Sequence, residues 1–206
     1  MSNVLHIMSS PQPSSCSVSK KVANAFIDAY CVLNPDDNLK EIDLYQTDIP
    51  FISEIIVNVW NGSQTCEDDL VYQDLKRLDE LCDEFISADK YVFSIPNWNS
   101  FAPPVLVEYV LAVMRLNKAF KYTKDGSITG LLKGKKAMIV IASGYTCSAP
   151  NSFKCYAGPW IKQMLVSCGI NDVDELIVEG IDERPEQASC LVEVAMKRAV
   201  DKAGSF

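Results

Sequence analysis

The stretch YVFSIPNWNS, residues 91–100, decides the fold. Its first half, Tyr91–Ile95, is a short uncharged run rich in β-forming residues, which predicts a buried strand. Pro96 ends the strand because proline has no N–H to donate to a sheet. Two side-chain amides and an indole follow at 97–99. Ligands of open α/β sheets bind beyond the carboxyl ends of the strands, so we expect a binding site here.

Working outward, apolar runs of strand length alternate with patterns of helical spacing. The predicted strands are Val4–Met8, Leu39–Leu44, Tyr91–Ile95, Lys136–Ala142 and Asp174–Glu179. The predicted helices are 19–33, 67–87, 103–118, 158–168 and 184–203. This alternation predicts a single α/β domain over residues 1–206, with a five-stranded parallel sheet covered by helices on both faces. Right-handed crossovers favour the flavodoxin-like strand order 2-1-3-4-5, with Leu39–Leu44 in an outer position.

Two segments do not fit this alternation. Residues 45–65 carry an apolar patch, and we expect a short helix or a flap there. Residues 120–134 have β-forming residues on either side of Asp125-Gly126, which predicts a β-hairpin. The helix over 103–118 is expected to face inward with its apolar residues, which are Leu106, Val107, Val110, Leu111 and Met114.

The composition narrows the class of protein. A formal net charge of −8 argues against binding to nucleic acid or to anionic lipid, both of which attract lysine and arginine. The first residues lack the basic and apolar regions of a signal peptide, and no run is long enough to cross a membrane, so we expect a cytoplasmic protein.

The eight cysteines show no C-x-x-C pair and no neighbouring histidines, so we expect no metal site. Four of them fall in helical patterns and are interpreted as small buried apolar residues: Cys31, Cys82, Cys168 and Cys190. Cys147 and Cys155 fall in a loop expected near the ligand, where a redox role stays open.

Three loops leave the predicted strands at their carboxyl ends: 9–19, 96–100 and 143–157. The first is rich in hydroxyls and leads into a helix. Helix N–H groups, the helix dipole and the hydroxyls of Ser17 and Ser19 together make an anion site, although such serines also serve as simple helix caps. The loop has neither a G-x-x-x-x-G-K nor a G-x-G-x-x-G pattern. A monophosphate held by neutral donors is the expectation that fits.

The other two loops offer flat and polar surfaces. Asn97, Trp98 and Asn99 suit a planar ligand edged with heteroatoms, such as an isoalloxazine ring, but they could also be a core residue and turn formers. The third loop begins Ser143-Gly144-Tyr145, where the glycine allows close approach of the backbone.

The chain offers no acid–base or nucleophilic constellation of its own. His6 is the only histidine, and it falls inside the first predicted strand, so no Ser-His-Asp or Cys-His arrangement can be assembled. Redox chemistry by a bound flavin needs no such group, since the cofactor carries the reaction. We therefore predict no catalytic residue in the protein itself.

With these residues assembled, the chain resembles the FMN-dependent NADH-azoreductase family of flavodoxin-like NAD(P)H:quinone oxidoreductases over nearly its whole length. The resemblance rests on short motifs in matching order, which are Ser9-Ser10, Ser17-Val18-Ser19, Pro96-Asn97-Trp98-Asn99, Phe120-Lys121-Tyr122-Thr123 with Asp125-Gly126, Gly134-Lys135-Lys136-Ala137 and Glu179-Gly180-Ile181.

The resemblance implies a homodimer that binds FMN at the subunit interface and reduces quinones or azo compounds with NADH or NADPH in a ping-pong reaction. It implies that Ser10, Ser17, Val18 and Ser19 hold the phosphate. It further implies that two segments flank the ring and meet its polar edge, namely Pro96, Asn97, Trp98, Asn99 and Ser100, and Ser143, Gly144, Tyr145 and Thr146. Trp98 stands where relatives commonly have tyrosine, and Ser143–Thr146 reads S-G-Y-T where they have S-R-G-G.

An alternative is a flavodoxin-like electron carrier or flavin-binding protein without turnover of its own. Carriers tend to be smaller, whereas this chain adds residues 45–65 and 120–134. These additions suit a dimer interface and a covered substrate pocket, for which Trp60, Phe120 and Tyr122 are candidate lining residues.

Overall fold

The computed structural model describes residues 1–148 and 154–206, and the middle of the predicted loop 143–157 lies outside this range. At its centre is a parallel sheet of five strands, in the order β2-β1-β3-β6-β7. The strands are β1 (Asn3–Met8), β2 (Asn38–Asp43), β3 (Lys90–Pro96), β6 (Lys136–Ala142) and β7 (Asp172–Val178). In strand numbers of the sheet alone this is the predicted order 2-1-3-4-5, with β2 at an edge as expected.

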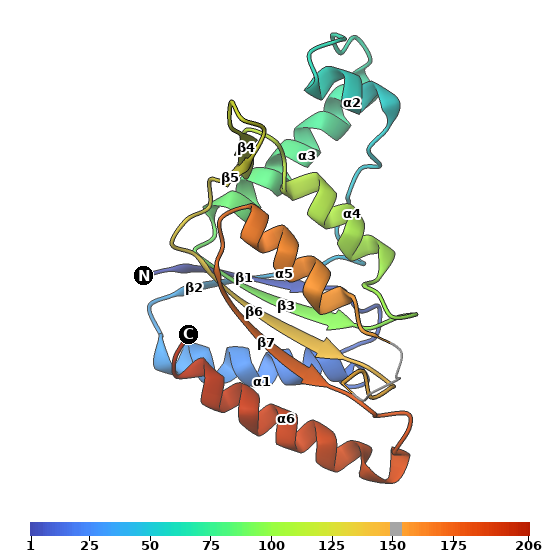
Figure 1. Ribbon diagram of the computed structural model, residues 1–206, viewed down its shortest axis with the longest axis vertical. Helices are drawn as coiled ribbons and strands as arrows, with labels where there is room; N and C mark the ends of the chain where they lie inside the picture. Colours follow the sequence, from blue (N-terminus) through green and yellow to red (C-terminus); the bar gives the residue numbers. More distant parts are fainter. Residues whose placement is uncertain (149–153) are drawn as a thin grey trace.

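Helices cover both faces of the sheet (Figure 1). One face carries α1 (Val18–Leu33) and α6 (Ala188–Ala203), and the other carries α3 (Asp69–Ser87), α4 (Pro104–Val113) and α5 (Ala157–Ser167). Side chains of β3 alternate between the two layers. Tyr91 and Phe93 join the core under α3, α4 and α5, whereas Val92 joins the core under α1 and α6. Burial on both sides explains why the central strands are almost wholly apolar.

The two predicted additions form as separate elements. Residues 45–65 contain the short helix α2 (Glu54–Trp60), which Ser53 caps by accepting a hydrogen bond from the Ile56 amide. Residues 120–134 contain the antiparallel hairpin of β4 (Phe120–Tyr122) and β5 (Ile128–Gly130). Both lie above the sheet in Figure 1, which makes the molecule elongated.

Two predicted helix boundaries were wrong. The helix predicted to reach Lys118 ends at Val113, because the chain turns through Asn117, whose φ is +62°, while Arg115 and Lys118 pair with Asp79 of α3. The helix predicted from Arg184 begins at Ala188, after a single turn of 3₁₀-helix at η1 (Pro185–Gln187). Proline suits such a first turn because it has no N–H to leave without a partner.

Some predicted core residues are on the surface. Leu111 of α4 is 54% exposed and Cys190 of α6 is exposed, because each points away from the sheet, and Cys31 is only half-buried. Cys82 and Cys168 are buried as predicted, and burial raises the pKa of the Cys168 thiol to about 12. His6 is fully buried as predicted, and its Nδ1 lies 3.0 Å from Oε1 of Glu41 on β2.

Candidate functional site

The three loops at the carboxyl ends of β1, β3 and β6 lie against one another, as the topology predicted. The amide and hydroxyl of Ser9 both donate to the carbonyl of Ser94, over 3.1 and 3.0 Å. One strand further on, the Asn97 amide donates to the carbonyl of Ala142 over 2.8 Å, and the Asn97 side-chain Nδ2 donates to Oγ of Ser143 over 3.1 Å. We call these segments, residues 9–17, 97–101 and 143–148, the rim loops.

The first rim loop presents hydroxyls at the amino terminus of α1. Ser17 is the N-cap of the helix and accepts a hydrogen bond from the Lys20 amide, while its Oγ lies 3.2 Å from Oγ of Ser19. Ser10, Ser17 and Ser19 are all buried. The neighbouring Lys20 amine is held by Asp43, 2.9 Å away. The partial positive charge at the start of α1 therefore comes from the helix dipole and its N–H groups, which suit a small anion.

Asn97 lies at the meeting point of the second and third rim loops with half of its amide unused. Its side chain is buried and its Nδ2 faces Ser143, but its Oδ1 has no hydrogen-bond partner among the described residues. Oγ of Ser94, near the carboxyl end of β3, also has no hydrogen-bond partner among the described residues. Buried polar atoms are costly without a partner, so a ligand that bonds to them would be stabilised here.

The chain reverses just after Asn97 in a tight turn. The backbones of Trp98 and Phe101 bond to each other in both directions, over 2.8 and 2.9 Å. Between them, Asn99 and Ser100 have φ values of +47° and +68°, the left-handed conformation of a type I′ turn. Such a conformation is unusual without glycine and costs of order 1 kcal/mol per residue. Strained turns of this kind cluster at functional sites, where the surrounding structure maintains them.

This turn leaves the indole of Trp98 41% exposed beside the rim. The other end of the turn is tied to α5, because the Tyr156 amide donates to the carbonyl of Ser100 over 2.8 Å. Behind it, the ring of Phe101 packs on that of Trp160, with 5.3 Å between the centroids. The turn is therefore anchored on one side and presents an aromatic surface on the other.

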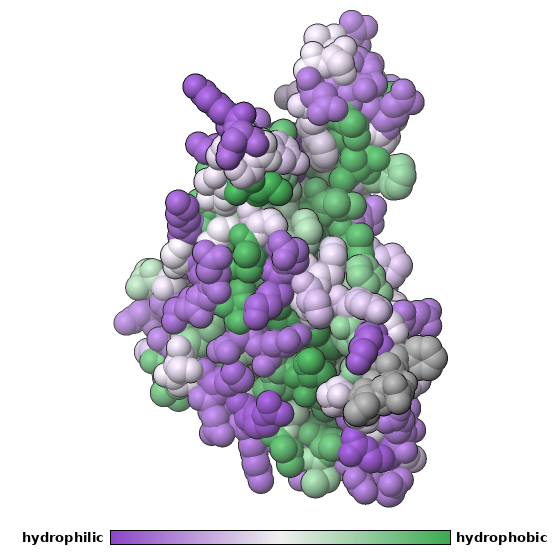
Figure 2. All heavy atoms as spheres, viewed as in Figure 1, coloured by the Kyte–Doolittle hydropathy of each residue, from purple (hydrophilic) through white to green (hydrophobic). Residues whose placement is uncertain are grey.

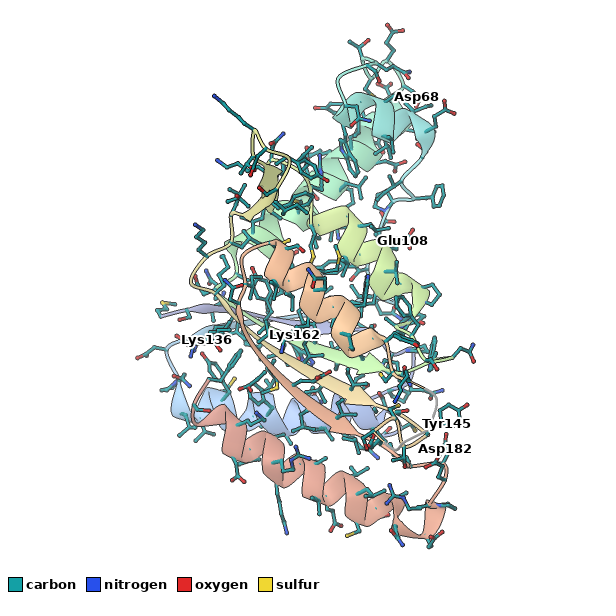
Figure 3. All side chains as sticks on the ribbon, viewed as in Figure 1. Asp68, Glu108, Lys136, Tyr145, Lys162 and Asp182 are labelled. Carbon is teal, nitrogen blue, oxygen red and sulfur yellow. The ribbon has the colours of Figure 1, made fainter. Side chains whose placement is uncertain are left out.

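The third rim loop is shaped by close contact with the loop after β7. The carbonyl of Gly144 accepts hydrogen bonds from the amides of Asp182 and Glu183. A Cβ at position 144 would lie 2.1 Å from Oδ2 of Asp182, so any other residue there would require the Asp182 side chain to move. Figure 3 shows Tyr145 and Asp182 close together at this end of the sheet, and the Tyr145 side chain is 45% exposed.

Two carboxylates hold the rest of that loop. Glu183 accepts hydrogen bonds from the amide and hydroxyl of Thr146, over 3.0 and 2.6 Å. Glu179 accepts from the amides of Cys147 and Ser148, over 2.8 and 3.1 Å. Thr146 thus donates within the chain, and its predicted contact with a ring edge stays a prediction.

The three predicted pocket-lining residues lie elsewhere in this chain. Phe120 and Tyr122 belong to the hairpin, which Figure 1 shows toward the opposite end of the strands from the rim. Trp60 lies at the end of α2, where the guanidinium of Arg115 stacks 4.1 Å above its ring. The structure therefore keeps the two hairpin residues away from the rim loops of the same chain, whereas Trp60 lines a cleft together with Phe101 of the second rim loop.

Trp60 instead contributes to a second open surface, a cleft of about 820 Å³ between the segment before α2 and α4. We call it the apolar cleft. Its lining residues are Phe51, Ile52, Trp60, Phe101, Ala102, Pro104, Val107, Glu108 and Leu111. Figure 2 shows hydrophobic residues along this side of the molecule, below α2. Glu108, labelled in Figure 3, is the single charged residue of the lining.

The sequence reasoning missed several residues of the rim. Ser9 was assigned only by resemblance, yet it joins β1 to β3, and Cys147 was not expected to touch Asn97 and Ser143. Glu179 was expected to end a strand and to belong to a family motif, but it was given no role in holding the third rim loop. Its place at the carboxyl end of the neighbouring strand is the signal that could have found it.

Within residues 1–148 and 154–206, His, Cys, Asp and Glu side chains form no group able to hold a metal ion. In the same part of the chain, every helix is too short or too polar to cross a membrane.

The sheet order, the loops at its switch point and the buried hydroxyls define a flavodoxin-like protein. The chain belongs to the family described as having a flavodoxin-like fold, whose model matches residues 2–202.

Among its relatives is FMN-dependent NADH:quinone oxidoreductase 2 of Listeria innocua, 38% identical over the full length of both chains. The Bacillus subtilis protein of the same name is 36% identical, also over both full lengths. Among solved structures, the azoreductase of Bacillus anthracis str. Sterne superposes with a TM-score of 0.91 at 27% identity, covering both chains completely. An FMN-dependent NADH-azoreductase of Bacillus anthracis in complex with FMN gives a TM-score of 0.87 at 26% identity, covering 100% of this chain and 99% of that one.

Proposed function

We propose that this protein is an FMN-dependent NADH:quinone oxidoreductase. The observation that carries the proposal is that the second and third rim loops meet at Asn97, whose buried Oδ1 has no partner among the described residues, while Ser9 joins the first rim loop to β3. The names of the relatives supply the cofactor, the donor and the acceptor. We further propose that azo compounds are accepted as well, as the azoreductase relatives suggest.

The residues of the first rim loop fit the phosphate of FMN. Ser10, Ser17 and Ser19 offer buried hydroxyls next to the amino terminus of α1, and Val18 is the first residue of that helix. A helix amino terminus with neutral hydroxyl donors suits one phosphate group with two negative charges. The absence of a nearby unpaired lysine in the described loop agrees with a monophosphate rather than a triphosphate, since Lys20 is paired with Asp43.

The residues of the other two rim loops fit the ring. The exposed indole of Trp98 would cover one side, and the amide of Asn97 together with Ser143, Gly144 and Tyr145 would meet the polar edge. Pro96, Asn99, Ser100 and Thr146 would shape these loops. When bound, FMN supplies two-electron chemistry, accepting a hydride from a nicotinamide and delivering the electrons to an acceptor. The protein's part is to orient the ring and to leave one side of it open to each substrate in turn, which is the basis of the proposed ping-pong order.

We propose that the active form is a homodimer formed through the apolar cleft. This surface exposes Phe51 and Leu111, which are 78% and 54% exposed, on either side of the half-buried Trp60. Its polar content is small, and apolar patches of this kind on soluble proteins commonly mark association sites. A partner subunit would also bring the hairpin residues Phe120 and Tyr122 to a site that they do not reach in their own chain.

Steady-state kinetics test the function. We expect NADH oxidation that depends on a benzoquinone acceptor, with parallel double-reciprocal lines when one substrate is varied at several concentrations of the other. NADPH in place of NADH and an azo dye in place of the quinone establish the breadth of each site. Intersecting lines would contradict the ping-pong order. A protein that binds FMN but oxidises neither nucleotide would instead be the electron carrier considered above.

We also propose a cytoplasmic location. The chain has eight cysteines, and thiols persist in reducing compartments. Fractionation of cells that produce the protein tests this directly.

A further inference from the structure

A second cavity lies beside the rim, at the edge strand β7, with a volume of about 570 Å³. Two cysteine side chains from opposite ends of one loop, Cys147 and Cys155, line it together. The two thiols are close enough for a side-chain hydrogen bond to form between them. Neither is joined in a disulfide, and neither is needed for the proposed reduction of a quinone.

The two sulfur atoms have different surroundings. Sγ of Cys147 lies 3.3 Å from Oγ of Ser143 and 3.9 Å from Nδ2 of Asn97, so polar groups face it from its own loop and from the second rim loop. Cys155 packs against the hydrophobic core, and its burial raises the pKa of the thiol. The Cys147 side chain is therefore the better first nucleophile, because its sulfur faces polar groups whereas burial keeps the Cys155 thiol protonated.

We propose that Cys147 and Cys155 form a reversible dithiol–disulfide pair that hydroperoxides oxidise, next to the groups that would hold the flavin. In the first step, sulfur of Cys147 attacks one oxygen of hydrogen peroxide; the S–O bond forms, the O–O bond breaks and one water leaves. In the second, sulfur of Cys155 attacks the resulting sulfenic acid; the S–S bond forms, the S–O bond breaks and a second water leaves. Both thiol protons end on the two waters, so two thiols and one peroxide give one disulfide and two waters.

The shared cavity favours attack of Cys155 on the sulfenic acid of Cys147 over attack by an outside thiol. Both thiols line one cavity and interact there, so the Cys155 thiol is already beside the sulfenic acid, whereas an outside thiol must first enter. The reverse step needs an external dithiol, which attacks the disulfide and leaves as a disulfide itself.

Oxidation would alter the predicted cofactor site, because Cys147 touches both Asn97 and Ser143. The disulfide removes the S–H donor and draws the sulfur toward Cys155. We expect FMN to bind about fivefold more weakly to the oxidised protein, the effect of one neutral hydrogen bond. This second part rests on the proposed function, whereas formation of the disulfide does not.

The test is peroxide treatment of the whole protein, followed by thiol titration and peptide mass spectrometry. We expect loss of two of the eight thiols and one linked peptide pair that contains Cys147 and Cys155, both restored by dithiothreitol. In Cys155→Ser, we expect no such link, and a sulfenic acid at Cys147 that a carbon nucleophile such as dimedone traps. The matched control is Cys190→Ser, which removes an exposed thiol on α6 and should leave the link unchanged.

Oxidation of the exposed Cys190 while both cavity cysteines stay reduced would overturn the proposal. A link that forms without any change in the FMN dissociation constant, measured by fluorescence titration, would overturn its second part. Failure of both oxidised and reduced protein to bind FMN would count against the proposed function instead, and the mass shift of the linked peptides would still decide the disulfide.

Discussion

The rim loops and the apolar cleft are two surfaces of this molecule that are built in opposite ways. The rim holds buried polar atoms that have no partner within residues 1–148 and 154–206, among them Asn97 Oδ1, next to a helix amino terminus and two left-handed turn residues. The lining residues of the apolar cleft are hydrophobic apart from Glu108. A small polar ligand would complete the first surface, whereas another apolar surface would complete the second. The two surfaces therefore require different binding partners and should respond to different substitutions.

The largest expected effect comes from placing a negative charge in the rim with Ser17→Asp. Aspartate is also a good N-cap, so α1 should keep its start. A carboxylate within about 4 Å of a phosphate costs roughly 4 kcal/mol in such surroundings. We therefore expect FMN binding to weaken by roughly 100-fold or more, as measured by fluorescence titration. Ser15→Asp, an exposed change in the same loop, is the matched control; equal effects of both substitutions would place the phosphate elsewhere.

The next effect belongs to the apolar cleft. Leu111→Asp puts a charge on a surface proposed to be buried between two subunits, and a central interface residue commonly contributes about 2 kcal/mol or more. We expect the dimer to dissociate to a 22.9 kDa monomer, seen by light scattering after gel filtration, with little change in folding. Leu33→Asp is the control, because Leu33 is similarly exposed but lies on α1. A wild-type protein that is already monomeric would contradict the proposed interface.

A smaller effect is expected at the aromatic wall of the rim. Trp98→Ala removes a surface on which a flavin ring would stack, and stacking of one aromatic ring on a base contributes about 1–3 kcal/mol. We expect the FMN dissociation constant to rise roughly tenfold. Trp98→Phe should restore most of the affinity, because it keeps a flat ring. Unchanged affinity in Trp98→Ala would mean that the indole does not contact the ring.

The smallest effect tests a carboxylate outside both surfaces. Burial raises the pKa of Glu175 on β7, and its Oε1 has no partner among the described residues. Because the folded-state pKa lies above the unfolded value, stability is highest below the unfolded pKa and falls as the pH rises through the folded one. Glu175→Gln stays neutral, so we expect Tm at pH 7 to rise by roughly 2–4 °C, with the gain vanishing near pH 4. A gain that persists unchanged at pH 4 would show that charge is not the cause.

Much of the fold could be predicted from the sequence because its signals are local and repeated. The apolar run of Lys136–Ala142 and the helical spacing of 67–87 each specify their element without help from distant residues. The strand order then followed from general handedness rules. By contrast, the end of α4 depends on Arg115 and Lys118 pairing with Asp79, a contact 36 and 39 residues away that periodicity does not encode.

The site was predictable in outline but not in detail. Topology alone places the ends of β1, β3 and β6 together, and the Asn97–Ser143 contact follows from that arrangement. The left-handed turn at Asn99 and Ser100 could not be predicted from the sequence, because it contains no glycine. The contact of Cys147 with Asn97 joins residues 50 positions apart, which periodicity does not encode, and the proposed approach of Trp60 and Phe120 to a bound ring requires a second subunit.

The most direct test of the central claim is the visible absorption spectrum of the purified protein, recorded before and after NADH is added without oxygen. We expect a flavin spectrum with about one FMN per chain, bleached by NADH and restored by a quinone. A protein that stays colourless after incubation with excess FMN would show that the rim loops do not form a flavin site, and would contradict the account.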